Sequence, residues 1–448
     1  MFKPLTAAAS LCAMFLLTAG PAAEALAWPS ASTGTDIGGS LPSGFEPSGI
    51  VWDDFTGALW VVDDEGMLAR MLRDGTFTSH WTVSVGLDLE SVAVTGTTQK
   101  LYVGKEYPAT IYEYNSSSTG APTSASKSWV LSSFDPAATA LKGMEGLTWV
   151  PNGYHPYANS SSGGLFFASS QASGTIYVYD VNLSASGNTN TSAPIHLFTP
   201  DPAQDDISDL YFSPSTRTLF VLYGAANKVL EIDTTTTSYS IMSSYTMPTS
   251  NTEQEGVTLL PQCPGALTDI YLAYDEGNSG PHSIYLFDNF PQLCATALSA
   301  TADATTKQAS PNGNYGSQSS LSVDSAANDD DNFLIRFSLS GINAANINRA
   351  RLLFYATDGT DLSPQYCATT TNWSETGATW NNQPVCNSNN VGGGASVANN
   401  SWVSYNMLGA LQGGWSSFRF APRSPHDFVA NSRQAGSNRP QLILWMNQ

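Results

Sequence analysis

Three glutamates stand at one position of a short segment that recurs along the first two thirds of the chain. The segments are 47–52, 89–94, 144–149, 207–212 and 254–259. The recurring position holds Glu90, Glu145 and Glu255 in three of them and Ser48 and Ser208 in the other two. Carboxylates brought together repel one another, which raises their pKa values unless a cation binds. Calcium accepts about six to eight oxygen ligands with loose geometry, so a calcium site is the first chemistry that this spacing suggests.

The elements that must position these residues are short strands. Each segment is followed by a second strand, LWVVDDEG, LYVGKEYP, LFFASSQASG, LFVLYGAAN and IYLAYDEGN in chain order, and four segments by a clear third, IYEYN, IYVYD, VLEID and SIYLFD. A unit of several strands that recurs at intervals of roughly 40 to 60 residues is typical of a propeller blade. We predict a β-propeller of five blades, or of six if residues 29–43 supply another.

Equivalent positions of a propeller lie at equal distances from its axis, and the first strand of a blade is usually the innermost. Glu90, Glu145 and Glu255 should therefore point into one channel, with Asp209 beside them, and these four are the predicted metal ligands. The alternative is structural, with the glutamates capping backbone amides between blades. Asp64 and Glu106 end second strands, so we expect them at one mouth of the channel as ligand-binding groups.

Carboxylates at such a mouth could also serve as general acid and general base. Little else in the chain supports an enzyme. The five histidines lack metal-ligand spacing, and neither a nucleophile elbow nor a phosphate-binding glycine loop is present. Propellers host hydrolases, lyases and binding platforms alike. An enzyme, if the protein is one, would be a calcium-dependent hydrolase with its site in the channel.

Residues 1–27 have the pattern of a secretory signal peptide, with Lys3, an apolar stretch and small residues before a cleavage point near Ala27. We expect a secreted or periplasmic protein without a transmembrane segment. Four cysteines remain after cleavage, and an even number in an exported protein favours disulfides. The predicted pairs are Cys263–Cys294 and Cys367–Cys386.

The formal charge is -20, although only 12% of the residues are charged. An acidic chain with few lysines repels nucleic acids and anionic membrane surfaces, so we exclude both as partners. We expect a monomer.

A second pattern begins after the propeller. The strands SLSVDS, NFLIRFSLS, RARLLFYAT, WVSYNML, SSFRFAP and PQLILWM alternate apolar and polar residues between Gly, Asn and Pro. This alternation predicts an antiparallel β-sandwich, a jelly roll, and makes the whole mature protein all-β. We place the propeller at 28–297 and the sandwich at 298–448.

The C-terminal region of the chain resembles a known domain. Residues 302–304 (ADA), 314–316 (NYG) and 333–337 (FLIRF) are similar to the opening of the DNRLRE domain, and 373–381 (WSETGATWN) to its central signature. That domain is similar to carbohydrate-binding module family 96, which implies a jelly-roll sandwich that binds polysaccharide. Trp373 and Trp380 are the predicted sugar-binding residues, since indole faces stack on pyranose rings. The alternative, which we favour for signature tryptophans, is that both belong to the core.

The propeller resembles the SdiA-regulated family, which is related to the phytase-like propellers. The Glu-Gly-(Leu/Val) strands carry this resemblance, together with 105–108 (KEYP) and 219–222 (LFVL). It implies the fold and brings no catalytic residues.

Three functions follow. The first is a secreted protein that binds extracellular or cell-envelope polysaccharide through the sandwich, with a calcium-dependent ligand-binding face on the propeller. The second is a propeller hydrolase of phosphoester, ester or glycosidic bonds, targeted to its substrate by the sandwich. The third is a structural surface or matrix protein.

Overall fold

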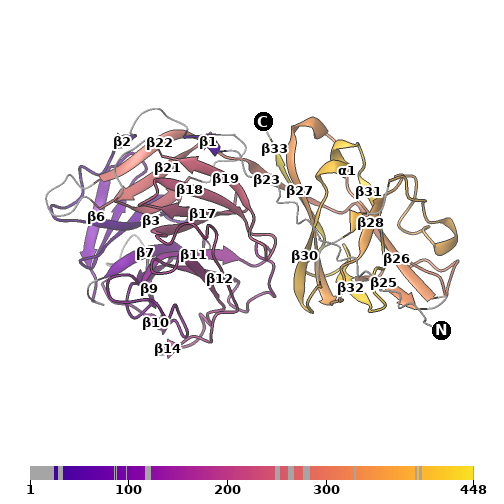
Figure 1. Ribbon diagram of the computed structural model, residues 1–448, viewed down its shortest axis with the longest axis horizontal. Helices are drawn as coiled ribbons and strands as arrows, with labels where there is room; N and C mark the ends of the chain where they lie inside the picture. Colours follow the sequence, from indigo (N-terminus) through magenta and orange to yellow (C-terminus); the bar gives the residue numbers. More distant parts are fainter. Residues whose placement is uncertain are drawn as a thin grey trace, which may run out of the picture.

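The structure is a computed structural model, and it describes residues 25–28, 34–84, 86, 88–96, 98–116, 123–247, 253–260, 267–275, 283–326, 329–388, 391–392 and 396–446. Two lobes lie side by side, a propeller in indigo to magenta and a sandwich in orange to yellow (Figure 1). Both are built of strands, so the all-β prediction is confirmed.

The propeller has five blades, each a sheet that runs outward from an inner strand. Blade 1 consists of β3 (Pro47–Asp53), β4 (Ala58–Asp63), β5 (Met67–Met71) and β6 (Phe77–Thr82). Blade 2 consists of β7 (Leu89–Val94), β8 (Lys100–Lys105), β9 (Thr110–Asn115), β10 (Lys127–Val130) and β14 (Asn188–Asn190). Blade 3 consists of β11 (Met144–Pro151), β12 (Gly164–Ser170), β13 (Thr175–Tyr179) and β15 (His196–Phe198).

Blade 4 consists of β16 (Asp209–Ser213), β17 (Thr218–Tyr223), β18 (Lys228–Asp233), β19 (Ile241–Thr246) and β1 (Ala25–Ala27). Blade 5 consists of β20 (Gln254–Leu259), β21 (Leu267–Tyr274), β22 (Ser283–Pro291) and β2 (Thr35–Asp36). The inner strands adjoin in the order β3, β7, β11, β16, β20 and back to β3, which closes the ring.

The ring is closed by the N-terminal segment. Thr35 and Asp36 pair with Leu286 and Tyr285 of β22, so β2 becomes the outer strand of blade 5. Residues 34–43 therefore complete the fifth blade and form no sixth one. Of the two predicted blade numbers, five is correct.

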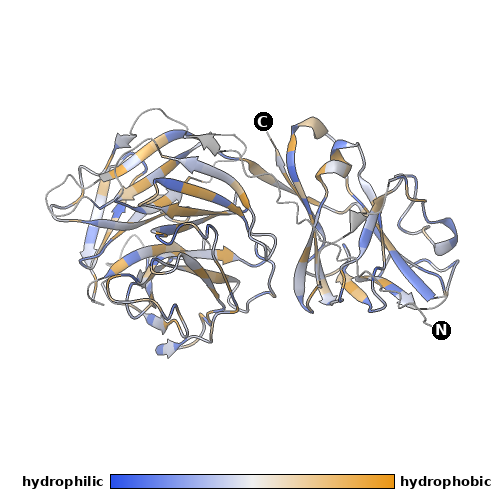
Figure 2. Ribbon diagram, in the orientation of Figure 1, coloured by the Kyte–Doolittle hydropathy of each residue, from blue (hydrophilic) through white to orange (hydrophobic). Residues whose placement is uncertain are grey.

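Burial explains why the inner strands read as continuous apolar runs. Every residue of the inner strand β16 and of the second strands β4 and β17 is buried, because both faces of these strands pack against neighbouring blades. The outer strand β6 instead alternates between partly buried and exposed residues. Hydrophobic residues accordingly concentrate on the strands of both domains (Figure 2).

The C-terminal domain is one curled antiparallel sheet that folds over its own core. One layer holds β23 (Cys294–Ser299), β33 (Gln441–Met446), β27 (Ile347–Asp358), β30 (Ser401–Asn406) and β32 (Phe428–Asn431). The other holds β24 (Ala302–Lys307), β26 (Asp329–Arg336), β31 (Ser417–Ala421), β28 (Gln365–Ala368) and β29 (Val391–Gly392). β25 (Ser320–Ala326) pairs with β32 at one end and β26 at the other, which joins the layers. A short helix, α1 (Leu408–Gln412), follows β30.

Aromatic rings fill the core between these layers. The rings of Phe333 and Phe420 stack with their centroids 4.7 Å apart, and Phe354 meets Phe420 edge-on at 5.1 Å. All three side chains are fully buried.

The predicted disulfide Cys367–Cys386 is confirmed, with Cα atoms 5.5 Å apart. Cys294 is also disulfide-bonded. Its proposed partner, Cys263, lies outside the described residues, as do residues 1–24 of the predicted signal peptide. No helix within the described ranges is long and apolar enough to cross a membrane.

The two domains contact each other through blades 3 and 4 of the propeller and the layer of β23, β33, β27 and β30 (Figure 1). The indole N–H of Trp445 donates to the backbone oxygen of Thr216 at 2.6 Å, and the amide of Trp402 donates to Pro156 at 3.1 Å. Apolar side chains of the sandwich, Trp445 among them, pack against Met242 of the propeller. β23 crosses the predicted boundary at 297/298 and pairs with β33 of the sandwich.

Candidate functional site

The recurring acidic position is a β-bulge in the inner strands. In β3, β7 and β20 the pairing skips one residue, namely Ser48, Glu90 and Glu255. In β11 the skipped residues are Glu145 and Gly146, which together oppose Ser169. A bulge leaves its extra residue out of the ladder and turns that side chain away from the sheet. Glu90, Glu145 and Glu255 therefore take no part in the strand ladder of their blades, which leaves their carboxylates available for a ligand.

The three glutamates share one electrostatic environment. Burial raises the pKa of Glu145 well above its ordinary value, and the charges of Glu90 and Glu255 raise it further. Burial and then the charge of Glu90 likewise raise the pKa of Glu255. Burial, with Glu106 and Asp64 next, raises the pKa of Glu90 to about 8, although a hydrogen bond from Ser48 opposes the shift. The charge of Glu90 therefore acts on both other glutamates, whereas the three carboxylates of the described residues that lie close enough for one metal ion are those of Glu46, Asp64 and Glu65.

A second set of acids accompanies them. Each of its members stands two residues before the recurring position of its own repeat, which is a bulge in all of these repeats but that of Asp206: Glu46, Asp88, Asp206 and Glu253. Asp88 acts on the pKa of Glu90, Asp206 on those of Glu145 and Glu255, and Glu253 on that of Glu255. The sequence contains the pattern that could have revealed this set: in four of the five repeats an acid stands two residues before the recurring position.

In blade 3 the position two residues before Glu145 holds Gly143 in place of an acid. Glu106 of blade 2 lies against this glycine, where a side chain would otherwise be. The amide of Gly143 donates to Oε1 of Glu106 at 2.8 Å. A Cβ atom on Gly143 would lie 2.6 Å from the backbone oxygen of Glu106. The predicted ligand-binding residue Glu106 therefore also fixes blade 2 to blade 3, and burial raises its pKa.

Asp209, a predicted metal ligand, lies elsewhere. Its Oδ1 accepts from the amide of Leu210 at 2.7 Å and its Oδ2 from the amide of Val257 at 2.8 Å. The side chain is 1% exposed, and burial raises its pKa well above the ordinary value. Asp209 thus caps backbone amides between β16 and β20, which is the structural role that the sequence analysis offered as the alternative for this ring.

Glycines take the corresponding position, one residue after the bulge, in three other blades. A Cβ atom on Gly49 would lie 2.5 Å from the backbone oxygen of Glu90, and one on Gly146 would lie 2.7 Å from the amide nitrogen of Leu210. A Cβ atom on Gly256 would lie 3.0 Å from the amide nitrogen of Ile50. The Glu-Gly repeat therefore combines a carboxylate that leaves the ladder with close approach of the next inner strand.

Asp64, the other predicted ligand-binding acid, belongs to a compact group. Carboxylate oxygens of Glu46, Asp64 and Glu65 lie within 4.8 Å of one another, a spacing that suits one metal ion. Burial raises the pKa of Asp64 to about 6, and the charges of Glu46 and Asp275 contribute. Because Asp64 also acts on Glu90, this group continues the acidic surface from blade 1 to blade 2.

The two signature tryptophans of the sandwich have different environments. The indole N–H of Trp373 donates to Oγ of Ser417 at 2.9 Å, and the guanidinium of Arg336 lies 5.1 Å from its ring. Trp373 also packs against Leu334 and therefore helps to build the sandwich. Trp380 is only partly buried at the start of a 3-10 helix, Trp380–Asn382. Both tryptophans are thus partly exposed, and Trp373 is the one whose printed contacts build the sandwich.

Glu375, which stands between these tryptophans in the signature, accepts hydrogen bonds through its side chain from three other residues of the domain. Its Oε1 accepts from Nε of Arg433 at 2.7 Å, from Nε2 of Gln434 at 2.9 Å and from the amide of Asp303 at 3.0 Å. These bonds tie the signature loop to the first and last parts of the domain, which explains why the motif identifies the fold.

Fold and sites together define a two-domain protein, a five-bladed propeller with an acidic inner ring followed by a carbohydrate-binding type of sandwich. Residues 295–446 match the model of carbohydrate-binding module family 96, and residues 43–259 match the model of the SdiA-regulated family. Both predicted resemblances are thereby confirmed. No curated protein matches the chain. Among solved structures, the glutaminyl cyclase of Myxococcus xanthus is 14% identical over 56% of this chain and 92% of its own, with a TM-score of 0.38, which says nothing about activity.

Proposed function

We propose that this protein is exported and binds extracellular or cell-envelope polysaccharide through its C-terminal sandwich, while its propeller presents a calcium-dependent ligand-binding face. The match of residues 295–446 to carbohydrate-binding module family 96 is the observation that carries this proposal. A carbohydrate-binding module beside a propeller fits a carbohydrate-associated protein. The disulfide Cys367–Cys386 supports export, because such bonds persist in oxidising compartments.

Within the sandwich, Trp380 is the proposed stacking surface. Trp373 and Trp380 are both partly exposed, but Trp373 is engaged with Ser417 and Arg336. Stacking of a pyranose on an indole combines apolar contact with a polar rim. A glycan panel probed with the full chain tests this assignment, and failure to bind any member would contradict the proposed function.

In the propeller, calcium would bind where the acids converge. The charged groups that raise the pKa values of Glu90, Glu145 and Glu255 are all carboxylates. A divalent cation removes this repulsion, because it favours the charged form of each ligand. Oxygen-rich, acidic and loosely arranged donors suit calcium better than zinc, which prefers nitrogen and sulfur.

Titration calorimetry of calcium into the chelator-treated full chain tests the cation. We expect binding that is lost in a variant with Glu90, Glu145 and Glu255 all changed to Gln. The matched control changes Asp329, Asp330 and Asp361 of the sandwich to Asn, which removes the same charge far from the channel. Equal binding in both variants would place the calcium elsewhere, and the group of Glu46, Asp64 and Glu65 would then be tested next.

A hydrolase is the second candidate, and the spread of pKa values supports it. Burial raises the pKa of Glu90 to about 8 and that of Asp64 to about 6. Two neighbouring carboxyl groups with different pKa values can divide the roles of acid and base at neutral pH. Changing Glu145 to Gln should then abolish turnover of phosphoester, ester or glycoside substrates and leave the melting temperature nearly unchanged. Binding without turnover in the unaltered protein would exclude this candidate.

A further inference from the structure

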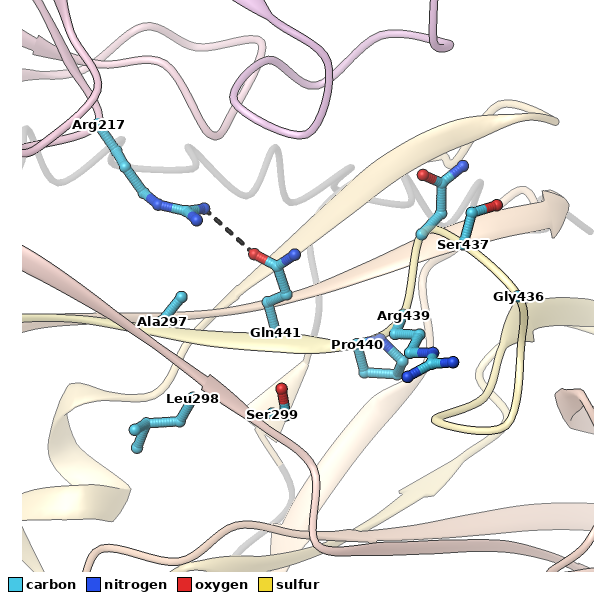
Figure 3. A pocket seen from close by; sticks show the side chains of 10 residues that line it. Arg217, Ala297, Leu298, Ser299, Gly436, Ser437, Arg439, Pro440 and Gln441 are labelled. Atoms are coloured by element: carbon cyan, nitrogen blue, oxygen red, sulfur yellow. Dashed lines mark hydrogen bonds between the residues drawn. The ribbon is translucent and has the colours of Figure 1, made fainter.

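A polar pocket of about 450 Å³ lies where the propeller meets the sandwich. The propeller contributes Arg217, from the turn between β16 and β17, and the sandwich contributes residues 297–299 of β23 and 436–441 before and within β33. Figure 3 shows Arg217 reaching across from the propeller to Gln441, with Arg439 and the turn around Ser437 along the sandwich side. The volume falls in the range of small-molecule sites, about 300 to 1,000 Å³.

Both charged residues of this pocket are arginines. The other lining residues are uncharged, and neither Arg217 nor Arg439 makes an ion pair with a carboxylate of the described chain. The whole protein has 37 acidic and 17 basic residues, so a pocket lined by two guanidinium groups and by no carboxylate differs from its overall charge. By contrast, Arg349, Arg351 and Arg433 each pair with a carboxylate.

Arg217 is held in place by uncharged groups. Its guanidinium lies 4.3 Å from the centre of the Tyr154 ring and donates through Nη1 to Oε1 of Gln441 at 3.2 Å. Burial lowers its pKa, and no carboxylate contributes to the shift. A guanidinium that is desolvated and fixed without a counter-charge is prepared to receive an anion, because less ordering is needed when one binds.

The sandwich side of the pocket is fixed as well. Nε of Arg439 donates to the backbone oxygen of Ala435 at 2.6 Å, and Asn438 accepts from Asn159 of the propeller at 2.8 Å. Asn431 donates to the backbone oxygen of Ser437 at 3.1 Å. These bonds hold the turn 436–439 against the propeller, so the pocket exists only while the two domains are joined.

We propose that this seam pocket, defined by Arg217, Arg439 and Gln441 with the serines 299 and 437, binds an oxyanion. The ligand chemistry is a carboxylate, sulfate or phosphate group, which the planar donors of arginine recognise in pairs. Neutral hydroxyl and amide side chains around the arginines would bind the rest of the molecule that carries the anion. The source of that group, a free inorganic anion or an acidic saccharide, is left to experiment.

This site is separate from the proposed stacking surface at Trp380, because it needs the propeller. The proposal therefore does not depend on carbohydrate binding by the sandwich. A variant with Trp380 changed to Ala should lose neutral glycans and keep the oxyanion, whereas R217Q should do the reverse.

Titration calorimetry with the full chain tests the proposal, with glucuronate, inorganic phosphate and uncharged glucose as probes. We expect glucuronate, phosphate or both to bind more tightly than glucose, and the affinity to fall as sodium chloride is raised. R217Q should weaken anion binding about 10- to 100-fold, as expected for loss of hydrogen bonds to a charged group. R439Q, which leaves the contact between Arg217 and Gln441 intact, should also weaken it.

The matched control is R73Q, which removes one exposed arginine of the propeller and leaves the pocket unchanged. It should bind both anions as the unaltered chain does. Tighter binding of glucuronate than of phosphate would identify an acidic saccharide as the source, and the opposite order a free anion; both outcomes support the site. Binding of neither anion, equal binding of glucose, or an equal loss in R73Q would overturn it.

Discussion

Oδ2 of Asp233, at the end of β18 in the propeller, lies 3.2 Å from Nε of Arg351 in β27 of the sandwich. Nη1 of Arg349 lies 3.4 Å from the same oxygen. The other carboxylate oxygen accepts from the amide of Thr235 at 2.9 Å and from its hydroxyl at 2.6 Å. Asp233 is fully buried, so the two domains share a desolvated ionic contact at the centre of their interface.

Changing Asp233 to Ala should destabilise the whole molecule. Removal of Asp233 leaves the partly exposed Arg349 and Arg351 without their paired carboxylate, so we expect a cost below the about 3–5 kcal/mol typical of a fully buried pair. In differential scanning calorimetry we expect a lower melting temperature and separate transitions for propeller and sandwich. The control is D361A, because the pair of Asp361 with His426 is exposed and its loss should cost less than about 1 kcal/mol. One unchanged transition in D233A would contradict the coupling of the domains.

The acidic ring should make stability fall as the pH rises. The folded-state pKa of Glu90 is about 8, against an ordinary value of 4.5, so the folded protein holds a proton that the unfolded chain releases. The stabilisation is complete below about pH 4.5 and is lost as the pH rises through about 8. Glu145 and Glu255 act in the same direction.

Melting temperatures at pH 5 and pH 8 in the presence of a chelator measure this effect. E90Q should flatten the dependence, because glutamine has no proton to lose. Added calcium should restore stability at pH 8 in the unaltered chain, since it neutralises the ionised carboxylates. If calcium has no effect at pH 8, the ring holds protons and no cation.

The signature tryptophans should respond differently to truncation. Trp373→Ala removes a hydrogen bond to Ser417 and the packing against Leu334, so we expect a loss of about 2 kcal/mol in the free energy of unfolding. Trp380→Ala should leave the unfolding free energy within about 0.5 kcal/mol and abolish glycan binding. Urea denaturation and the glycan panel measure the two effects. Retained glycan binding in W380A would move the sugar site away from the signature.

The glycines after the bulges should not tolerate a side chain. In Gly146→Ala the new methyl group would lie 2.7 Å from the amide nitrogen of Leu210 and 2.8 Å from the carbonyl carbon of Asp209, so β11 and β16 must separate. We expect a loss of about 1–3 kcal/mol, measured by urea denaturation. Gly39→Ala, where the added carbon meets nothing within 4 Å, is the control and should be close to neutral. Equal stability of the two variants would show that the inner strands are not closely packed.

Much of the site could be predicted from the chain because a propeller repeats its geometry. Equivalent positions of each repeat lie at the same level of the channel, so the spacing alone brought Glu90, Glu145 and Glu255 together. The same logic would have found Asp88 and Asp206, two residues before the recurring position, had it been applied there. Asp209 differs from the glutamates, because it stands one residue after the recurring position and its carboxylate accepts from the amide of Val257 in the neighbouring inner strand.

By itself the sequence determined the features that depend on neighbouring residues. These are the strands, which follow from alternating and continuous apolar runs, the five repeats, the pairing of Cys367 with Cys386, and the signature that identifies the sandwich. Only the tertiary structure decided what depends on distant segments. Residues 35–36 close the fifth blade, Glu106 fills the space over Gly143, and Asp233 meets Arg351 across 118 positions of chain. Such contacts arise because strands far apart in sequence are brought side by side by burial of their apolar faces. Neither a repeat nor a spacing in the sequence predicts which polar groups come into contact when these strands pack.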